Sequence, residues 1–128
     1  MVAGRMGVEL RIESNIVVLN VFGRAELSRQ GKSWSDRVRE AAEAIGSPVL
    51  LLCKVEPGVD LPPVALGAGA REALSIVPLL RAVAMVAAEE REQAMLRATA
   101  VAIRPHYPLR LFADEDEARA WLLQFAPT

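Results

Sequence analysis

The hydrophobic pattern of the chain centres on a short apolar run. Residues 48–55 read Pro-Val-Leu-Leu-Leu-Cys-Lys-Val, and turn residues lie on both sides, with Gly46 shortly before the run and Pro57-Gly58 just after it. A short apolar run between turn residues is typical of a strand that is buried on both faces. We therefore expect this segment to be the central strand of a small α/β sheet with helices on both sides.

Four other segments have the pattern of strands. Residues 8–13 alternate strictly between apolar and charged side chains, which predicts a half-exposed edge strand. Ser14-Asn15 separates this segment from residues 16–22 and predicts an antiparallel hairpin. Apolar runs at residues 80–87 and 109–112 predict two further strands.

Four segments have helical spacing and recognisable ends. Gly46 is suited to ending the first helix, Asp60 to capping the second, and Pro78 to ending the second. In the last helix the apolar residues recur at helical intervals, and in the third we expect Met95, Ala98, Thr99 and Ala102 along one face. The expected helices span residues 33–45, 60–77, 89–102 and 114–125.

The predicted element order is β-β-α-β-α-β-α-β-α. Strands that are separated by helices run parallel through right-handed crossovers, whereas the first two strands form a hairpin. We therefore expect an α/β fold with a mixed sheet, an N-terminal antiparallel hairpin followed by parallel strands, in a single domain over residues 1–128.

Net charge, cysteine content and the length of the apolar runs exclude several classes of function. The net charge is −1, so no overall field attracts nucleic acid or anionic lipid. One cysteine cannot form an internal disulfide, which fits a reducing compartment. No apolar run is long enough for a membrane span, and Met1–Gly7 is not followed by the apolar region of a signal peptide. We expect a soluble cytoplasmic protein that binds no nucleic acid.

Two segments make the chain resemble a STAS domain, and more narrowly the SpoIIAA-like group of small stand-alone bacterial proteins. They are the strand at residues 81–86 with the charged helix after it, and the closing strand and helix at residues 108–122. The resemblance implies the STAS-type fold. Related anti-sigma antagonists are switched by phosphorylation of a Ser or Thr in the loop that enters the second helix. This chain has no Ser or Thr between Ser47 and Ser75, so that mechanism is not expected here.

Acidic residues dominate the rim where the parallel strands are expected to end. They could form a site for a cation or a basic partner, but carboxylates are also favoured at helix N-termini by the helix dipole. They would repel a phosphate, and Gly31-Lys32-Ser33 lacks the earlier glycine of a P-loop, so we expect no nucleotide or other cofactor. The rim acids are Glu26, Glu56, Asp60, Glu89, Glu90, Asp114 and Glu115.

No catalytic or metal-binding set is expected. Cys53 lies near the carboxyl end of its strand and His106 precedes the last strand, so parallel strands place them at opposite rims. One thiol and one imidazole cannot form a zinc site without other ligands. We expect Cys53 to pack as a small hydrophobe and His106 to lie in a solvated loop.

Three functions remain open. The first is a non-enzymatic binding or regulatory module that acts through protein contact as a homodimer. The second is a carrier of a small apolar, lipid-like ligand beneath the second and third helices, and the disfavoured third is an enzyme. The candidate partner or ligand surface comprises Leu66, Gly67, Ala70, Leu74, Met95, Glu56 and Asp60.

Overall fold

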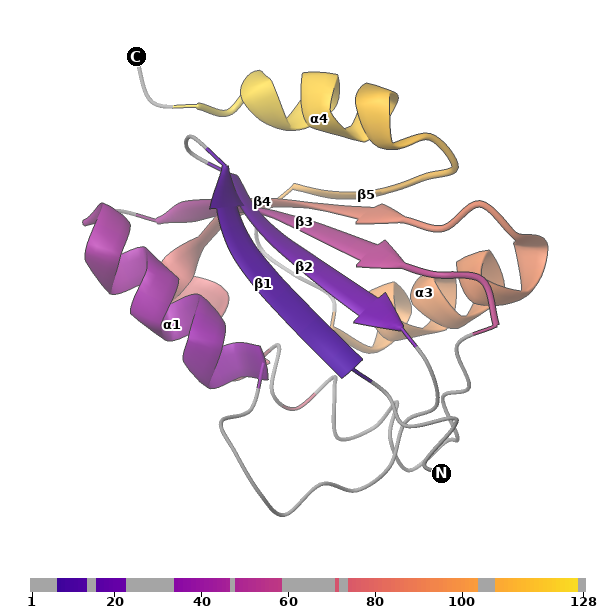
Figure 1. Cartoon of the computed structure of the whole chain (residues 1–128), viewed down its shortest axis with the longest axis horizontal. Coiled ribbons are helices and arrows are strands. Elements are labelled where there is room, and N and C mark those ends of the chain that lie inside the picture. Colours follow the sequence, from indigo (N-terminus) through magenta and orange to yellow (C-terminus); the bar gives the residue numbers. More distant parts are fainter. Residues whose placement is uncertain are drawn as a thin grey trace.

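The fold is a five-stranded mixed sheet with helices on both faces (Figure 1). It comes from a computed structural model that describes residues 7–13, 16–22, 34–46, 48–58, 71, 74–103 and 108–126. The strands are β1 (Gly7–Glu13), β2 (Ile16–Phe22), β3 (Val49–Val55), β4 (Leu80–Val86) and β5 (Leu109–Phe112). The helices are α1 (Trp34–Ile45), α3 (Glu90–Ile103), α4 (Glu115–Leu123) and a 3-10 turn at Val77–Leu79.

The sheet has the strand order β1-β2-β3-β4-β5. β1 and β2 are antiparallel, with register pairs running from Glu13↔Ile16 to Gly7↔Phe22. The pairs β2–β3, β3–β4 and β4–β5 are all parallel. The predicted α/β class, the hairpin followed by parallel strands, and the central position of β3 are therefore confirmed.

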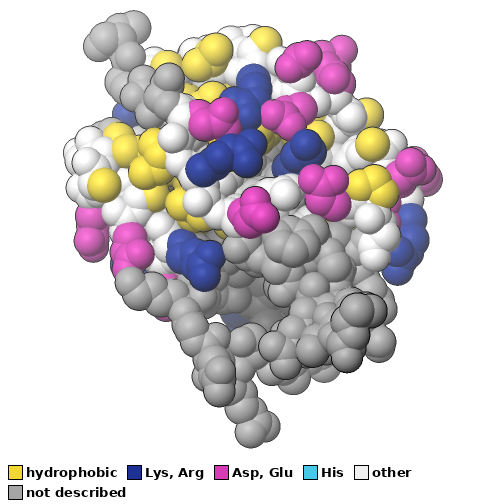
Figure 2. Space-filling view, viewed as in Figure 1, with side chains coloured by type: hydrophobic (Ala, Val, Ile, Leu, Met, Phe, Trp, Pro, Cys, Tyr) yellow, Lys and Arg dark blue, Asp and Glu magenta, His cyan; other side chains and the backbone are white. Residues whose placement is uncertain are grey.

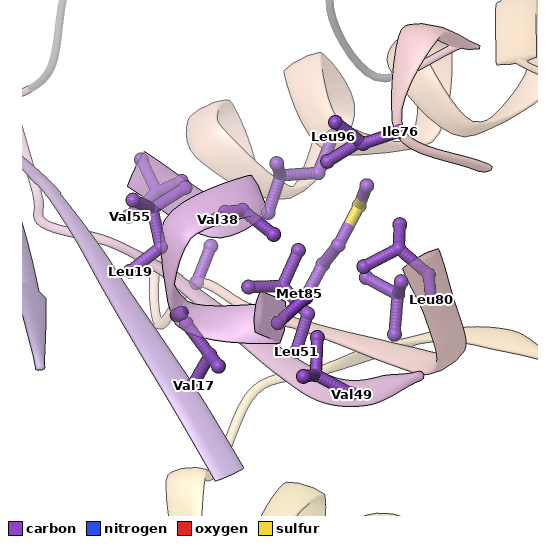
Figure 3. Packing of buried hydrophobic residues seen from close by; sticks show 14 residues of the cluster. Val17, Leu19, Val38, Val49, Leu51, Val55, Ile76, Leu80, Met85 and Leu96 are labelled. Atoms are coloured by element: carbon purple, nitrogen blue, oxygen red, sulfur yellow. The ribbon is translucent and has the colours of Figure 1, made fainter. Parts of the chain in front are cut away.

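Each face of the sheet carries its own apolar cluster. On one face α1 and α3 contribute Val38, Ala41 and Leu96 to a cluster with strand residues such as Leu51 (Figure 3). On the opposite face α4 packs on β3, β4 and β5, and in Figure 1 it lies above the sheet. The buried residues of that second cluster are Ile16, Val18, Leu50, Leu52, Ala82, Ala84, Val86, Phe112, Ala118 and Leu122.

β3 is buried from both sides along most of its length. The exposed fractions of Val49, Leu50, Leu51 and Leu52 are 1%, 1%, 4% and 0%. Successive side chains point to opposite faces, so Leu51 belongs to the α1–α3 cluster and Leu50 and Leu52 to the α4 cluster. This confirms the predicted doubly covered strand.

A bulge near the start of β4 changes which side chains share a face. Val49 pairs with Leu80, whereas the next residue, Leu50, pairs with Ala82. Arg81 is therefore the additional residue, and Leu80 and Val83 pack in the same cluster although they are three positions apart. The Nε atom of Arg81 is buried and has no hydrogen-bond partner within the part of the chain that the structure describes.

The helix ends follow the predicted signals. Gly46 adopts a positive φ of 84°, and its N–H donates to the carbonyl oxygen of Ala42 at 2.8 Å. Asp114 caps α4, because its carboxylate accepts a hydrogen bond from the N–H of Glu117 at 3.1 Å. Of the helices that the structure describes, none has the length and apolar content needed to cross a membrane.

The second predicted helix and the predicted face of the third helix are only partly described by the structure. Most of the predicted second helix, including Asp60, lies outside the described residues, and Pro78 falls in the 3-10 turn before β4. The residues predicted along one face of α3 are not its most buried ones. Met95 and Thr99 are half-buried and Ala98 is exposed, whereas the buried side chains among those described in α3 are Glu92 and Leu96. Apolar residues occur on more than one side of this helix, so their spacing does not define a single inward face.

Replacing Leu52 with alanine should destabilise the fold strongly. The side chain is fully buried between β3 and α4, so its removal should lower the free energy of unfolding by about 2–5 kcal/mol. Urea unfolding followed by circular dichroism measures this change. The matched control is Leu123→Ala, because Leu123 is 56% exposed and its truncation should change stability by less than about 0.5 kcal/mol. Equal effects of the two substitutions would contradict the burial of β3 beneath α4.

Candidate functional site

The carboxyl ends of the parallel strands meet at one rim of the sheet, where α/β proteins commonly bind ligands. Glu56 follows β3, Glu89 precedes α3, and Asp114 follows β5, so the predicted acidic rim is present among the described residues. Glu26 and Asp60 lie outside them. Across the residues that the structure describes, no group of three or more His, Cys, Asp or Glu side chains could hold a metal ion.

The rim acids have local structural roles. Asp114 caps α4, and Glu90 in the first turn of α3 pairs with Arg97, with 2.6 Å between Oε1 and Nη2. Glu115 in the first turn of α4 pairs with Lys54 across a distance of 3.1 Å. Helix N-termini and ion pairs thus explain Asp114, Glu90 and Glu115, and the described part of the rim shows no group of acids placed to hold a metal ion.

Arg119 joins the rim to the edge strand. Its Nε lies 2.9 Å from Glu115 and its Nη2 lies 3.1 Å from Glu13 of β1. Glu13 also accepts a hydrogen bond from the Nε of Arg11 at 2.9 Å. One arginine of α4 therefore ties this helix to the strand at the sheet edge.

Lys54 extends these ion pairs to β3. Its Nζ lies 3.1 Å from Oε1 of Glu115 and 3.9 Å from Oε1 of Glu56. Figure 2 shows dark blue and magenta side chains intermixed on the upper half of the viewed face. We call the whole series the ion-pair chain, and its three bases and three acids cancel in charge. Its members are Arg11, Glu13, Arg119, Glu115, Lys54 and Glu56.

The ion-pair chain shifts the titration of its members. Hydrogen bonds from Arg11 and Arg119 lower the pKa of Glu13. Partial burial alone would raise the pKa of Glu115, but hydrogen bonds from Arg119 and Lys54 outweigh it and lower the pKa. Both carboxylates are therefore held in the charged form, which suits a structural ion pair and does not suit a proton donor at neutral pH.

Glu92 is a buried acid that the sequence analysis did not single out. It is 2% exposed, and its Oε2 lies 3.4 Å from Nη1 of Arg91. It lies in the first turn of α3, where the helix dipole favours negative charge. Its neighbours in the sequence are also charged, so nothing in the local pattern marks it as buried.

Cys53 does not have the properties of a nucleophile. It packs against the apolar cluster under α1 and α3. Burial raises the pKa of its thiol to about 12, so the thiolate that would attack a substrate is scarce at neutral pH. His106, the other candidate for such chemistry, lies outside the described residues.

The predicted partner surface is only partly described. Leu74 is 50% exposed, while Met95 and Glu56 are half-buried. Leu66, Gly67, Ala70 and Asp60 lie outside the described residues. An apolar row on the outer side of α3 was not predicted, although its residues recur at helical spacing in the sequence. This row, the α3 stripe, consists of Ala94, Ala98 and Val101, which are all exposed.

A second apolar surface lies beside the edge strand. Leu10 and Ile12 of β1, with Ala41 and Ala44 of α1, line a shallow groove of about 390 Å³. Arg37 and Glu40 complete the lining, and Ile12 is 45% exposed. The groove was not predicted, because it depends on how α1 crosses β1 and not on the pattern of either segment alone.

Comparison with known proteins supports the fold. Neither protein-family models nor curated proteins give a match to this chain. A solved structure of an uncharacterised DUF3478-family protein with a SpoIIAA-like fold, from Shewanella loihica PV-4, superposes with a TM-score of 0.59. The similarity covers 95% of this chain and 96% of the other, at 14% sequence identity. The chain has a SpoIIAA-like fold. The predicted SpoIIAA-like fold is thus confirmed, and one fold can serve many functions.

Replacing Glu115 with glutamine should test the ion-pair chain within this SpoIIAA-like fold. The lowered pKa means that the stabilisation is complete above the ordinary carboxyl pKa and is lost as the pH falls through the lowered value. Glu115→Gln should therefore cost up to about 1 kcal/mol at neutral pH and almost nothing once the carboxyl groups are protonated. Urea unfolding midpoints across this pH range measure the difference.

The matched control for that experiment is Asp116→Asn. Asp116 lies in the same first turn of α4 and is exposed, but it belongs to no ion pair among the described residues. It therefore reports the helix-dipole contribution alone. An equal, pH-dependent loss in both variants would contradict a specific role for the Glu115 pairs.

Alkylation should show that Cys53 is unreactive in the folded chain. With a pKa of about 12, the thiolate fraction near pH 8 is roughly a thousandfold lower than in the unfolded chain. Iodoacetamide labelling, followed by mass spectrometry, should therefore be slower by at least about that factor in buffer than in concentrated urea. Labelling at similar rates under both conditions would show that the thiol is accessible and ionised.

Proposed function

We propose that this chain is a non-enzymatic binding or regulatory module that acts through protein contact, with the α3 stripe as its partner surface. The observation that carries the proposal is the exposure of the stripe, where Val101 alone is 68% exposed. An outer helix face is usually polar, so a row of apolar side chains there indicates a surface that another molecule covers.

The surroundings of the α3 stripe support a protein partner. Leu74 is 50% exposed and lies two residues before Ile76, which packs in the same cluster as Leu96 of α3 (Figure 3). Apolar surface is therefore available on the side of the sheet that α3 covers. Arg97 and Glu90 form an ion pair on the same helix, and a polar border of this kind is typical of protein interfaces.

The non-enzymatic part of the proposal rests on the chemistry of the described residues. Cys53 is held as a thiol, and Glu13 and Glu115 are held as ion-paired carboxylates. Neither arrangement provides a nucleophile next to a base that is oriented by a third group. The free cysteine also fits the cytoplasmic location that we propose with this function.

A carrier of a small apolar ligand is the alternative. Such a ligand would need space beneath α3 and the segment before β4. Among the described residues, Ile76 and Leu96 occupy this region and are 0% and 6% exposed (Figure 3). Because these side chains belong to one packed cluster, we favour contact at the outer surface over a ligand inside.

The proposed partner binding does not use a phosphorylated Ser or Thr in residues 48–74, because this segment contains neither residue.

The proposal includes a homodimer. The apolar α3 stripe and the free edge of β1 are its two candidate seams.

Substituting Val101 should weaken partner binding without unfolding the chain. Val101→Glu places a charge in the α3 stripe, and a charge in the centre of an apolar contact should reduce binding by about tenfold or more. Affinity capture from lysate by immobilised variants, with quantitative mass spectrometry, should show a protein that the wild type retains and Val101→Glu loses.

The matched control is Leu123→Glu, because Leu123 is a similarly exposed apolar residue on α4, across the sheet from α3. The specific protein should remain bound to this variant. Loss of the same protein from both variants, or retention by both, would contradict the assignment of the α3 stripe as the partner surface.

A further inference from the structure

β1 is the edge strand of the sheet that the structure describes. β1 is the first strand in the order β1-β2-β3-β4-β5 and is seven residues long. Within the described ranges, no strand pairs with its other side, and in Figure 1 it is the strand nearest the viewer. A long free edge presents unpaired N–H and C=O groups that can bind another strand.

The register shows which backbone groups face outward. The carbonyl oxygen of Val21 accepts a hydrogen bond from the N–H of Glu56, so this residue of β2 faces β3. Since backbone groups alternate in direction along a strand, Asn20 faces β1, and its partner there is Glu9. Gly7, Glu9, Arg11 and Glu13 therefore use their backbone groups for β2. The groups of Val8, Leu10 and Ile12 point to the free edge.

We propose that two copies of this chain pair through β1 in an antiparallel two-fold arrangement centred on Leu10. In this register Leu10 lies opposite Leu10 of the second copy, and Val8 lies opposite Ile12 of the second copy. All the outward N–H and C=O groups of these residues then find partners. The two sheets become one continuous sheet. This inference deepens the homodimer included in the proposed function, and it does not use the α3 stripe.

Charge favours this register over its neighbours. Centring the pair on Leu10 places Glu9 opposite Arg11 of the second copy, twice per dimer. A shift of the centre to Glu9 or to Arg11 would instead place identical charges opposite each other, which is destabilising. Glu9 is exposed and forms no ion pair among the described residues, so its carboxylate is available for this contact.

A centre on Ile12 would also bring Arg11 opposite a glutamate, Glu13 of the second copy. That register pairs only residues 11–13 of β1, because the strand ends at Glu13. Glu13 is also already bound to Arg119 of α4. The centre on Leu10 pairs the whole strand and leaves the Glu13–Arg119 pair intact, while Arg11 adds Glu9 of the second copy to its contact with Glu13.

The other face of β1 adds apolar contact in the same arrangement. Leu10 and Ile12 line the groove with Ala41 and Ala44 of α1, and Ile12 is 45% exposed. The two-fold axis brings the same groove of the second copy alongside. Each Ile12 can then be covered by the partner strand and by small side chains of α1.

Charged residues on an edge strand can also serve to prevent pairing. A series of like charges would do so in every register. In β1 the charges alternate as Glu9, Arg11 and Glu13, so they oppose some registers and favour one that pairs the full strand. The pattern therefore selects a single self-pairing.

Charge reversal on β1 tests the proposal. Glu9→Arg and Arg11→Glu each place like charges opposite one another in the dimer, so each variant should dissociate at least about tenfold more readily than the wild type. The double variant Glu9→Arg/Arg11→Glu restores opposite charges and should dimerise as the wild type does. Sedimentation velocity over a concentration series measures the dissociation, and circular dichroism confirms that each variant is folded.

Mixing the two single variants provides the decisive measurement. A Glu9→Arg chain and an Arg11→Glu chain present opposite charges at both contact points, so the mixture should form heterodimers that neither variant forms with itself. A monomeric wild type at all concentrations, or single variants that dimerise normally, would overturn the proposal. So would a mixture that remains monomeric.

A further variant separates this inference from the proposed partner surface. Val101→Glu lies on α3 and should leave the β1 dimer unchanged. If Val101→Glu splits the dimer while Glu9→Arg does not, the seam is the α3 stripe and the β1 pairing is wrong. If Glu9→Arg splits the dimer and Val101→Glu abolishes only partner capture, both assignments stand.

Discussion

The structure depends on the burial of β3 between two helical layers. Its odd and even positions enter different apolar clusters, so neither α1 with α3 nor α4 can be removed without exposing leucine side chains. Fully burying one such side chain stabilises the fold by about 1.5–3 kcal/mol. Because β3 is central, its direction also sets the direction of β2 and β4 and places their carboxyl ends at one rim.

As a consequence, α4 covers one edge of the sheet and not the other. α4 covers β3, β4 and β5 but does not extend its apolar face over β1. The residues of β1 on the α4 side are accordingly charged. One of them, Glu13, binds Arg119 of α4 at the edge of the apolar layer. The ion-pair chain thus marks the limit of the apolar layer and has no net charge. The ion-pair chain thus gives two of the rim acids, Glu56 and Glu115, a role within the fold.

Local sequence signals predicted much of this architecture, whereas features that depend on tertiary packing could not be predicted from the sequence. Gly46 and Asp114 end and begin helices through their own backbone and side-chain chemistry, so the sequence alone identifies them. The inward face of α3 depends on which of its apolar sides meets the sheet, and the bulge at Arg81 depends on pairing with β3. The burial of Glu92 likewise cannot be predicted from its neighbours in the sequence, which are charged or polar. The same limit applies to the candidate surface, because the exposure of Val101 follows from the orientation of α3.

The two proposed surfaces lead to a joint consequence. Pairing through β1 with a two-fold axis perpendicular to the sheet keeps the same face of both sheets on one side of the dimer. The α3 helices of the two copies would then lie on one side, and both α3 stripes would be presented in the same direction. A partner with two binding sites could engage both stripes, and its second contact would be intramolecular, which raises the overall affinity without any new type of contact. Self-pairing at the edge would therefore strengthen the binding of such a two-site partner at α3.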